Sequence, residues 1–187
     1  MIPLRLVIDT NIVVSAALKP DGLQRTILLL AITKPVRLYV SEPVLAEYRE
    51  VLARPELKIR KGLRQQVLQL IQSRSQTVKP SRPLQVTRDP DDNIFLECAD
   101  AARADYLVTG NVRHFPKFWK KTKVITSREF IGIVATHLIP RCQGEERASR
   151  YVRNLWMRVA TVNSGITDLQ GGAGPDGPVA QRRECRL

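Results

Sequence analysis

Short aliphatic segments alternate with longer amphipathic ones along this chain, and that alternation constrains the fold more than any other feature. Strands buried on both faces of a parallel sheet are short and aliphatic, and helices connect them. The predicted strands are residues 4–8, 36–40, 106–109 and 123–126, and the predicted helices are 23–32, 42–53, 60–73, 92–104 and 127–136. The pattern therefore predicts an α/β domain around a mostly parallel sheet.

The character of the chain changes after Pro140. Residues 141–187 hold six of the ten glycines and end in an Arg-rich segment. A stretch around 146–160 could form a helix, but the remainder lacks the apolar content needed to order itself. We therefore expect a globular domain over residues 1–140 and a flexible, basic, Gly-rich tail over residues 141–187.

Composition narrows the class of protein. The longest uncharged apolar run, residues 26–33, is too short to span a bilayer, and the N-terminus lacks the layout of a signal peptide. The three cysteines have no CxxC spacing, and the two histidines, His114 and His137, have no further ligands beside them in the sequence. We expect a cytoplasmic protein that contacts no membrane and has neither a disulfide framework nor a zinc site.

Positive charge is concentrated in two blocks. The chain has 30 Lys and Arg against 18 Asp and Glu, a net charge of +12. Residues 54–88 hold nine basic side chains and one acid, and residues 113–128 hold six and none. Such blocks favour nucleic acid, because each phosphate neutralised releases counterions, although a solvated surface is the alternative. The candidate RNA contacts are Arg60, Lys61, Arg64, Arg113, Lys117 and Lys120.

Asp9 stands where the first predicted strand ends, and Thr10 and Asn11 follow it. The carboxyl ends of strands in open α/β sheets converge on the crevice where ligands bind. The alternative is that Asp9 only caps the helix that follows. The sequence leaves both interpretations open.

Glu47 borders the apolar stripe of the predicted helix 42–53. Its neighbours at i−3 and i+4 are Val44 and Val51, and no basic residue of the same helix pairs with it, whereas Glu50 has Arg54 at i+4. An acid at such a position needs a cation from elsewhere, because burying it uncompensated is costly. A partly exposed glutamate at the edge of the stripe is the alternative.

The start of the predicted helix 92–104 has three acids, Asp89, Asp91 and Asp92, where a cap requires only one. Asp92 lies in line with Phe95 and Leu96 on the inward face of that helix. We therefore predict that Asp92 is a metal ligand and that Asp91 supports it or caps the helix.

Asn111 follows the predicted strand 106–109 after Gly110. Like Asp9, it lies at the carboxyl end of an aliphatic strand, and its amide oxygen could serve the same site. The alternative is conformational, because Gly and Asn both tolerate the positive φ of tight turns.

Oxygen ligands without cysteine or clustered histidine suit Mg²⁺ or Mn²⁺. Such an ion lowers the pKa of bound water and neutralises charge that develops on a phosphate. An acidic centre surrounded by basic side chains is the arrangement that a phosphodiesterase needs.

Four segments together resemble the PIN-domain nucleases, in particular the VapC-like toxins of bacterial toxin–antitoxin pairs. The matching segments are Val7-Ile8-Asp9-Thr10-Asn11, Ser41-Glu42-Pro43-Val44-Leu45-Ala46-Glu47, Asp89-Pro90-Asp91-Asp92-Asn93 and Tyr106-Leu107-Val108-Thr109-Gly110-Asn111. The resemblance covers residues 4 to about 139, and it rests on the order of the four segments.

The resemblance implies a three-layer α/β/α sandwich, metal-dependent cleavage of RNA, a homodimer and inhibition by an antitoxin protein. It also implies that Asp9, Glu47 and Asp92 are metal ligands, supported by Thr10 or Asn11. Asn111 departs from the family, which usually has a fourth aspartate at this position. We expect weaker affinity for a second metal ion and a preference for Mn²⁺.

Two alternatives remain open from the sequence. The first is a nucleic-acid-binding or regulatory protein whose catalytic site has decayed at Asn111. The second is a phosphatase of the haloacid-dehalogenase kind with Asp9 as nucleophile. That chemistry requires a second acid two residues later, and Asn11 occupies that position.

Overall fold

The structure is a computed structural model, and its described residues are 3–19 and 21–138. The predicted tail, residues 141–187, lies outside them, so its flexibility and the boundary after Pro140 stay predictions. No described helix is both long enough and apolar enough to cross a membrane.

A central sheet organises the described residues. Its strands are β1 (Arg5–Ile8), β2 (Arg37–Val40), β3 (Gln76–Thr77), β4 (Tyr106–Val108), β5 (Phe118–Trp119) and β6 (Thr122–Ile125). The strand order is β3-β2-β1-β4-β6-β5, and every neighbouring pair is parallel except β5 and β6. The predicted mostly parallel sheet is confirmed.

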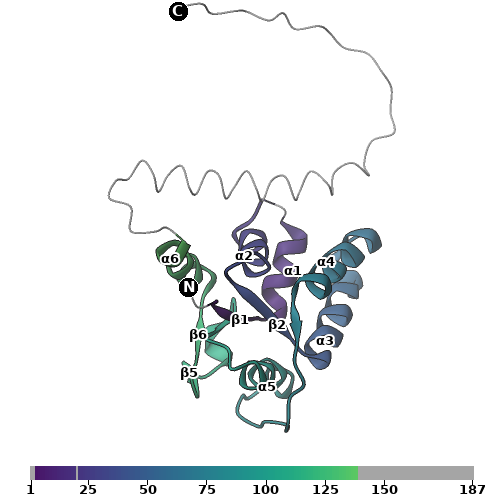
Figure 1. Cartoon of the computed structure of the whole chain (residues 1–187). Coiled ribbons are helices and arrows are strands. Elements are labelled where there is room, and N and C mark those ends of the chain that lie inside the picture. Colours follow the sequence, from purple (N-terminus) through teal and green to yellow (C-terminus); the bar gives the residue numbers. More distant parts are fainter. Residues whose placement is uncertain (1–2, 20, 139–187) are drawn as a thin grey trace, which may run out of the picture. The chain divides into compact units, whose positions relative to one another are not determined.

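Helices cover both faces of the sheet. They are α1 (Thr10–Leu18), α2 (Leu23–Ala31), α3 (Glu42–Ala53), α4 (Lys61–Arg74), α5 (Asn93–Ala102) and α6 (Ser127–Leu138), with the short 3₁₀ turns η1 (Pro55–Leu57), η2 (Pro90–Asp92) and η3 (Val112–His114). In Figure 1, α5 lies on one side of the strands, and α1 and α2 lie on the other. This arrangement is the expected α/β/α sandwich.

One helix and two strands were not predicted, for different physical reasons. Helix α1 is apolar nearly all round, with five of its nine residues buried, so it shows no amphipathic period. Strand β3 consists of two exposed polar residues at the edge of the sheet. Strand β5 is a two-residue antiparallel partner of β6 across a tight turn in which Lys120 has φ 52°. A further difference is that the predicted helix 92–104 begins at Asn93, because Asp92 belongs to η2.

The order of the strands reverses between β1 and β4, and we call the space outside the carboxyl ends of these two strands the crevice. From β1 the chain proceeds outward to β2 and β3, and it then returns to form β4 on the other side of β1. Ligands bind in open α/β sheets at such a reversal, outside the carboxyl ends of the strands. Asp9 leaves β1 at this point, and Thr109 leaves β4, so sequence segments 100 residues apart meet there.

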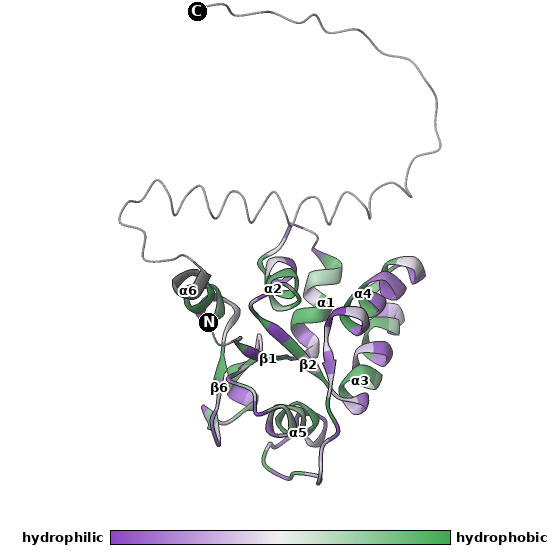
Figure 2. Ribbon diagram, in the orientation of Figure 1, coloured by the Kyte–Doolittle hydropathy of each residue, from purple (hydrophilic) through white to green (hydrophobic). Residues whose placement is uncertain are grey.

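Helix α3 packs against α1, α4 and α5, and one of its buried side chains reaches β1. Figure 2 shows the central strands as largely hydrophobic, whereas α3 and α4 carry both hydrophobic and hydrophilic residues. Tyr48 of α3 is completely buried, and its hydroxyl donates a hydrogen bond to the carbonyl oxygen of Ile8. Ile8 is the last residue of β1, so this bond fixes Glu47 and its helix beside Asp9.

Replacing Tyr48 with Phe is expected to lower the free energy of unfolding by about 1 kcal/mol, because it removes one buried hydrogen bond and keeps the ring. Urea denaturation measures the change. The matched control is Tyr39→Phe, since the Tyr39 hydroxyl makes no hydrogen bond within the described residues and its ring packs against Arg5. Equal destabilisation by the two substitutions would contradict this role for the Tyr48 hydroxyl.

Candidate active site

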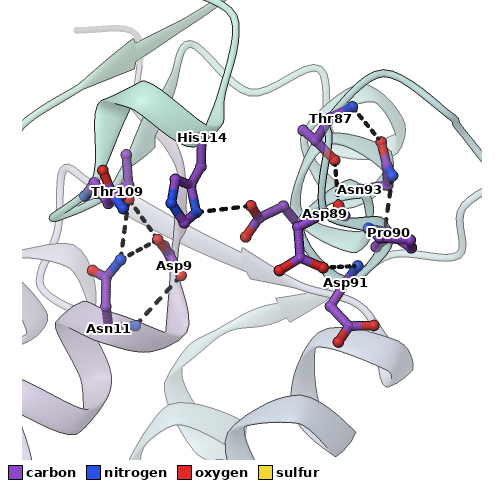
Figure 3. A network of polar contacts seen from close by, with 11 residues as sticks. Asp9, Asn11, Thr87, Asp89, Pro90, Asp91, Asn93, Thr109 and His114 are labelled. Carbon is purple, nitrogen blue, oxygen red and sulfur yellow. Dashed lines mark hydrogen bonds and ion pairs between the residues drawn. The ribbon is translucent and has the colours of Figure 1, made fainter.

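Asp9 both caps a helix and faces the crevice. Its side chain accepts a hydrogen bond from the backbone N–H of Asn11 at 3.4 Å, which makes it the N-cap of α1. Its carboxylate also accepts hydrogen bonds from the Asn11 amide and the Thr109 hydroxyl, as Figure 3 shows. Burial raises the pKa of the Asp9 carboxyl, and the hydrogen bonds from Thr109 and Asn11 oppose that change. The capping interpretation is therefore correct, but it does not account for the contact with β4.

Thr109 is the central residue of this network, and the sequence did not identify it as a site residue. Its side chain is completely buried. Its hydroxyl donates to Asp9 and accepts from the Asn11 amide at 3.2 Å and from the backbone N–H of Asn111 at 2.9 Å. A hydroxyl has one hydrogen to donate and two lone pairs, so all three are used. Thr109 therefore fixes the orientation of the Asp9 carboxylate.

Asn11 supports Asp9, as predicted, and it also connects the ends of β1 and β4. Its side-chain oxygen accepts a hydrogen bond from the backbone N–H of Gly110 at 2.8 Å. A Cβ at position 110 would lie 3.0 Å from the same oxygen. Glycine at this position allows the two strand ends to approach each other closely.

Asp92 occupies the N-cap position of α5, but its side chain makes no capping hydrogen bond. Asp89 caps η2 by accepting a hydrogen bond from the backbone N–H of Asp91 at 3.1 Å. The capping role predicted for Asp91 was therefore wrong, because Asp89 performs it, and the Asp91 side chain is exposed. Burial raises the pKa of Asp92, and the charge of Asp9 raises it further. Asp92 and Asp9 thus lie within electrostatic reach of each other.

His114 completes the contact between η3 and η2. Its Nδ1 lies 3.1 Å from Oδ2 of Asp92. In Figure 3, His114 lies between the group formed by Asp9, Asn11 and Thr109 and the segment that begins at Asp89. In the sequence, His114 is an isolated histidine, and it was not predicted as a site residue. Its position one 3₁₀ turn after Asn111 could have indicated that it lies near the site. Its partner Asp92, however, lies 22 residues earlier in the chain.

Glu47, on α3, is the third acid of the candidate site. Burial is the largest cause of its raised pKa, and the charge of Glu50 is the second. Asp91 and Asp9 raise the pKa of Glu47 further, and Arg54 lowers it. Glu47 therefore lies within electrostatic reach of Asp91 and Asp9, and Arg54 partly compensates its charge. Its role as a metal ligand stays a prediction.

Asn111 is exposed at the start of η3. Its φ is −128°, so a need for positive φ does not explain the residue. Its backbone N–H is bound to Thr109, whereas no hydrogen bond of its side chain is present among the described residues. The conformational alternative is therefore excluded, and the amide remains available at the edge of the crevice.

The candidate ligand atoms are oxygens, which is the type of ligand that a hard divalent cation prefers. Asp9, Glu47 and Asp92 supply carboxylate oxygens whose mutual repulsion positive charge would relieve. The hydroxyl of Thr10 is buried beside Asp9 without a hydrogen-bond partner within the described residues. In residues 3–19 and 21–138, however, no three Asp, Glu, His or Cys side chains lie close enough together to enclose one ion. Water and substrate oxygens would have to complete the coordination.

Replacing Glu47 with Gln is expected to raise the melting temperature by about 2 °C at neutral pH in EDTA. Because folding raises the Glu47 pKa above the ordinary value of 4.5, folding favours the protonated form. Stability contributed by this group is therefore fully present below pH 4.5 and is lost as the pH rises through the folded-state pKa.

Thermal melts of both proteins across this range measure the effect, with Glu56→Gln, at an exposed position in η1, as the control. The difference between Glu47→Gln and the unmodified protein should disappear below the ordinary carboxyl pKa, where both side chains are neutral. A melting temperature of Glu47→Gln at or below that of the unmodified protein at neutral pH would show that the Glu47 charge is already compensated.

The predicted RNA contacts differ in how accessible they are. Lys120 forms a short ion pair with Asp100 at 2.6 Å, and Arg64 donates to the carbonyl oxygen of Ala53 at 3.2 Å. The other four are exposed and form no ion pair with the described residues: Arg60, Lys61, Arg113 and Lys117. These four remain the stronger candidates for contacts with phosphate.

Known proteins resemble this chain in sequence and in structure. A sequence model of the PIN domain matches residues 5–113. The uncharacterized protein MJ1680 of Methanocaldococcus jannaschii is 31% identical over 142 residues, which cover 70% of this chain and 91% of that protein. A solved structure, VapBC2 of Rickettsia felis bound to a DNA fragment from its promoter, matches with 22% identity and a TM-score of 0.48, over 66% of this chain and 98% of the matched chain.

The family match accounts for the four sequence segments and for the position of Asp9 at the reversal of strand order. It gives no support to the phosphatase alternative, in which Asp9 would be a nucleophile. The match covers more than half of the chain. The chain belongs to the PIN-domain family.

Proposed function

We propose that the protein is a metal-dependent endoribonuclease. The observation that carries the proposal is geometric: Asp9 lies at the carboxyl end of β1 beside the end of β4, where Thr109 and Asn11 hold its carboxylate. His114 holds the Asp92 carboxylate. Burial raises the pKa of Glu47 and Asp92, the charge of Asp9 raises both further, and a divalent cation would relieve this repulsion. A site of this kind is typical of enzymes that cleave phosphodiesters.

In this proposal Asp9, Asp92 and Glu47 bind Mg²⁺ or Mn²⁺, with Asn111 contributing an amide oxygen or holding a water molecule. The bound ion supplies an activated water and neutralises charge on the phosphate. Thr109 and Asn11 orient Asp9, and His114 orients Asp92. The exposed basic side chains offset the repulsion that the acids would otherwise exert on RNA.

The toxin role, the partners and the location are part of the same proposal. The resemblance to VapC-like toxins supports a cytoplasmic toxin that forms a homodimer and is inhibited by an antitoxin protein. The net charge of +12 supports RNA as the substrate and an acidic partner surface as the inhibitor.

A test of the chemistry is the structure of the products. Cleavage of a defined RNA by activated water leaves no 2′,3′-cyclic phosphate, because the ribose 2′-hydroxyl does not attack. Products without this group, formed only with Mg²⁺ or Mn²⁺, would support the proposal. Cyclic-phosphate ends formed equally well in EDTA would overturn it.

The catalytically decayed binder is the second candidate. It is favoured by the absence of three clustered metal ligands in residues 3–19 and 21–138 and by Asn111 in place of an acid. Restoring the acid separates the two candidates. If Asn111→Asp creates RNA cleavage where the unmodified protein has none, the binder is correct.

A further inference from the structure

Phe118 is the most exposed of the large hydrophobic side chains in the described residues, with 59% of its surface accessible. It lies on β5, the strand at one edge of the sheet. The other phenylalanines described, at positions 95, 115 and 130, are buried. An exposed phenylalanine indicates a contact site when the residues around it also favour one kind of ligand.

The surroundings of Phe118 are basic. In the antiparallel pair β5–β6, Phe118 lies directly opposite Lys123, so the two side chains are on the same face of the sheet. Lys117 and Lys121 are exposed on the same hairpin, and the segment 113–128 contains no acid. These three lysines form no ion pair with the described residues. Hydrogen bonds from the backbone N–H and the hydroxyl of Thr126 are the main reason that the Glu129 pKa is lowered. The charge of Lys123 lowers it further, but the two side chains form no ion pair.

The neighbouring aromatic residue does not offer the same surface. Trp119 is only partly exposed, and the Lys120 ammonium group lies 5.9 Å from its ring centre. Lys120 is itself held by Asp100. The accessible ring on this hairpin is therefore that of Phe118, and the lysines with unpaired charge are those beside it.

A short segment of the chain connects the hairpin to the acidic crevice. Only four peptide links separate His114, which contacts Asp92, from Phe118. A fully extended chain of that length spans at most about 14 Å. A strand of RNA in the crevice can therefore reach the Phe118 ring within a few nucleotides.

We propose that Phe118 stacks on a base of single-stranded RNA while Lys117 and Lys123 contact the adjacent phosphates, next to the site of cleavage. Exposed aromatic rings within positive surface bind single strands in this way, and the stacking tolerates any base. The choice of RNA rests on the proposed function. A second copy of the chain is the less favourable occupant, because a symmetric contact would bring the same lysines of two copies together.

The test is binding of a fluorescein-labelled single-stranded RNA of mixed sequence to the full chain in EDTA, followed by fluorescence anisotropy. Phe118→Ala should weaken binding about tenfold, because it removes one stacking contact, whereas Phe118→Trp should bind at least as well as the unmodified protein. Lys123→Ala should lower the slope of log K against log salt by about 0.7, the value of one phosphate contact on a single strand.

Leu18→Ala is the matched control, since it removes another apolar side chain, 45% exposed, from a distant helix end. Equal RNA affinity for Phe118→Ala and Leu18→Ala would overturn the proposal. So would a Phe118→Ala variant that binds RNA normally but changes from dimer to monomer in light scattering, because Phe118 would then belong to an interface between copies. Since EDTA prevents metal-dependent cleavage, this result is independent of the nuclease proposal, which fails separately if Mg²⁺ and Mn²⁺ produce no cutting.

Discussion

Asp92→Asn is expected to reduce metal-dependent RNA cleavage by at least about 10²- to 10³-fold while the fold stays intact. The substitution keeps the shape of the side chain but removes the charge that would bind the cation. Losing a group that only orients a ligand already costs 10- to 100-fold in metalloenzymes, so losing a ligand should cost more. Single-turnover cleavage rates measure the effect, and circular dichroism confirms that the protein is folded.

The neighbouring acid provides the control for Asp92→Asn. Asp91 is exposed, and its backbone N–H, not its side chain, takes part in the cap of η2. Asp91→Asn should therefore reduce cleavage less than about tenfold. Undiminished cleavage by Asp92→Asn would remove Asp92 from the mechanism, whatever the control shows.

Thr109→Val is expected to lower the free energy of unfolding by about 2–3 kcal/mol and to impair cleavage as well. Valine fills the same volume, so the cost comes from lost hydrogen bonds and not from a cavity. The Asn11 amide and the backbone N–H of Asn111 would lose their acceptor, and Asp9 would lose its donor.

Thr109→Ser separates the hydroxyl from the methyl group, because serine retains all three hydrogen bonds. It should cost less than about 1.5 kcal/mol and retain most of the activity. Urea denaturation and cleavage rates should be measured for both variants. If Thr109→Val and Thr109→Ser are equally stable, the hydroxyl does not organise the site.

Much of the site could be predicted because the fold imposes it. Aliphatic runs as short as 4–8 form buried strands, and parallel strands bring their carboxyl ends to one edge. An acid at the end of such a run therefore lies where ligands bind. Helix 42–53 was predicted with the bounds that the structure has, because its proline near the start and its apolar stripe both mark it.

What could not be predicted depends on contacts between distant segments. The bond between His114 and Asp92 joins two 3₁₀ turns, and the role of Thr109 appears only when β4 lies beside β1. Strand β5 has two residues, which is too short to show any periodicity. The exposure of Phe118 follows from that edge position, and a phenylalanine in a sequence is more often part of a core.

Ionisation of the three acids at the crevice lowers the stability of the folded chain. Folding brings Asp9, Glu47 and Asp92 into an environment that raises the pKa of each, so their ionised forms destabilise the folded chain at neutral pH. A cation that binds only the folded protein would reverse this cost. Activity and the response of stability to divalent ions should therefore depend on the same residues.

The most direct test is cleavage of labelled total RNA by the purified full chain in Mg²⁺, Mn²⁺ or EDTA, with Asp9→Asn beside it. The account predicts cutting in Mg²⁺ or Mn²⁺, none in EDTA and none by Asp9→Asn. A folded preparation free of any bound inhibitor that cuts no RNA in either metal would contradict it, and so would cutting that persists in Asp9→Asn.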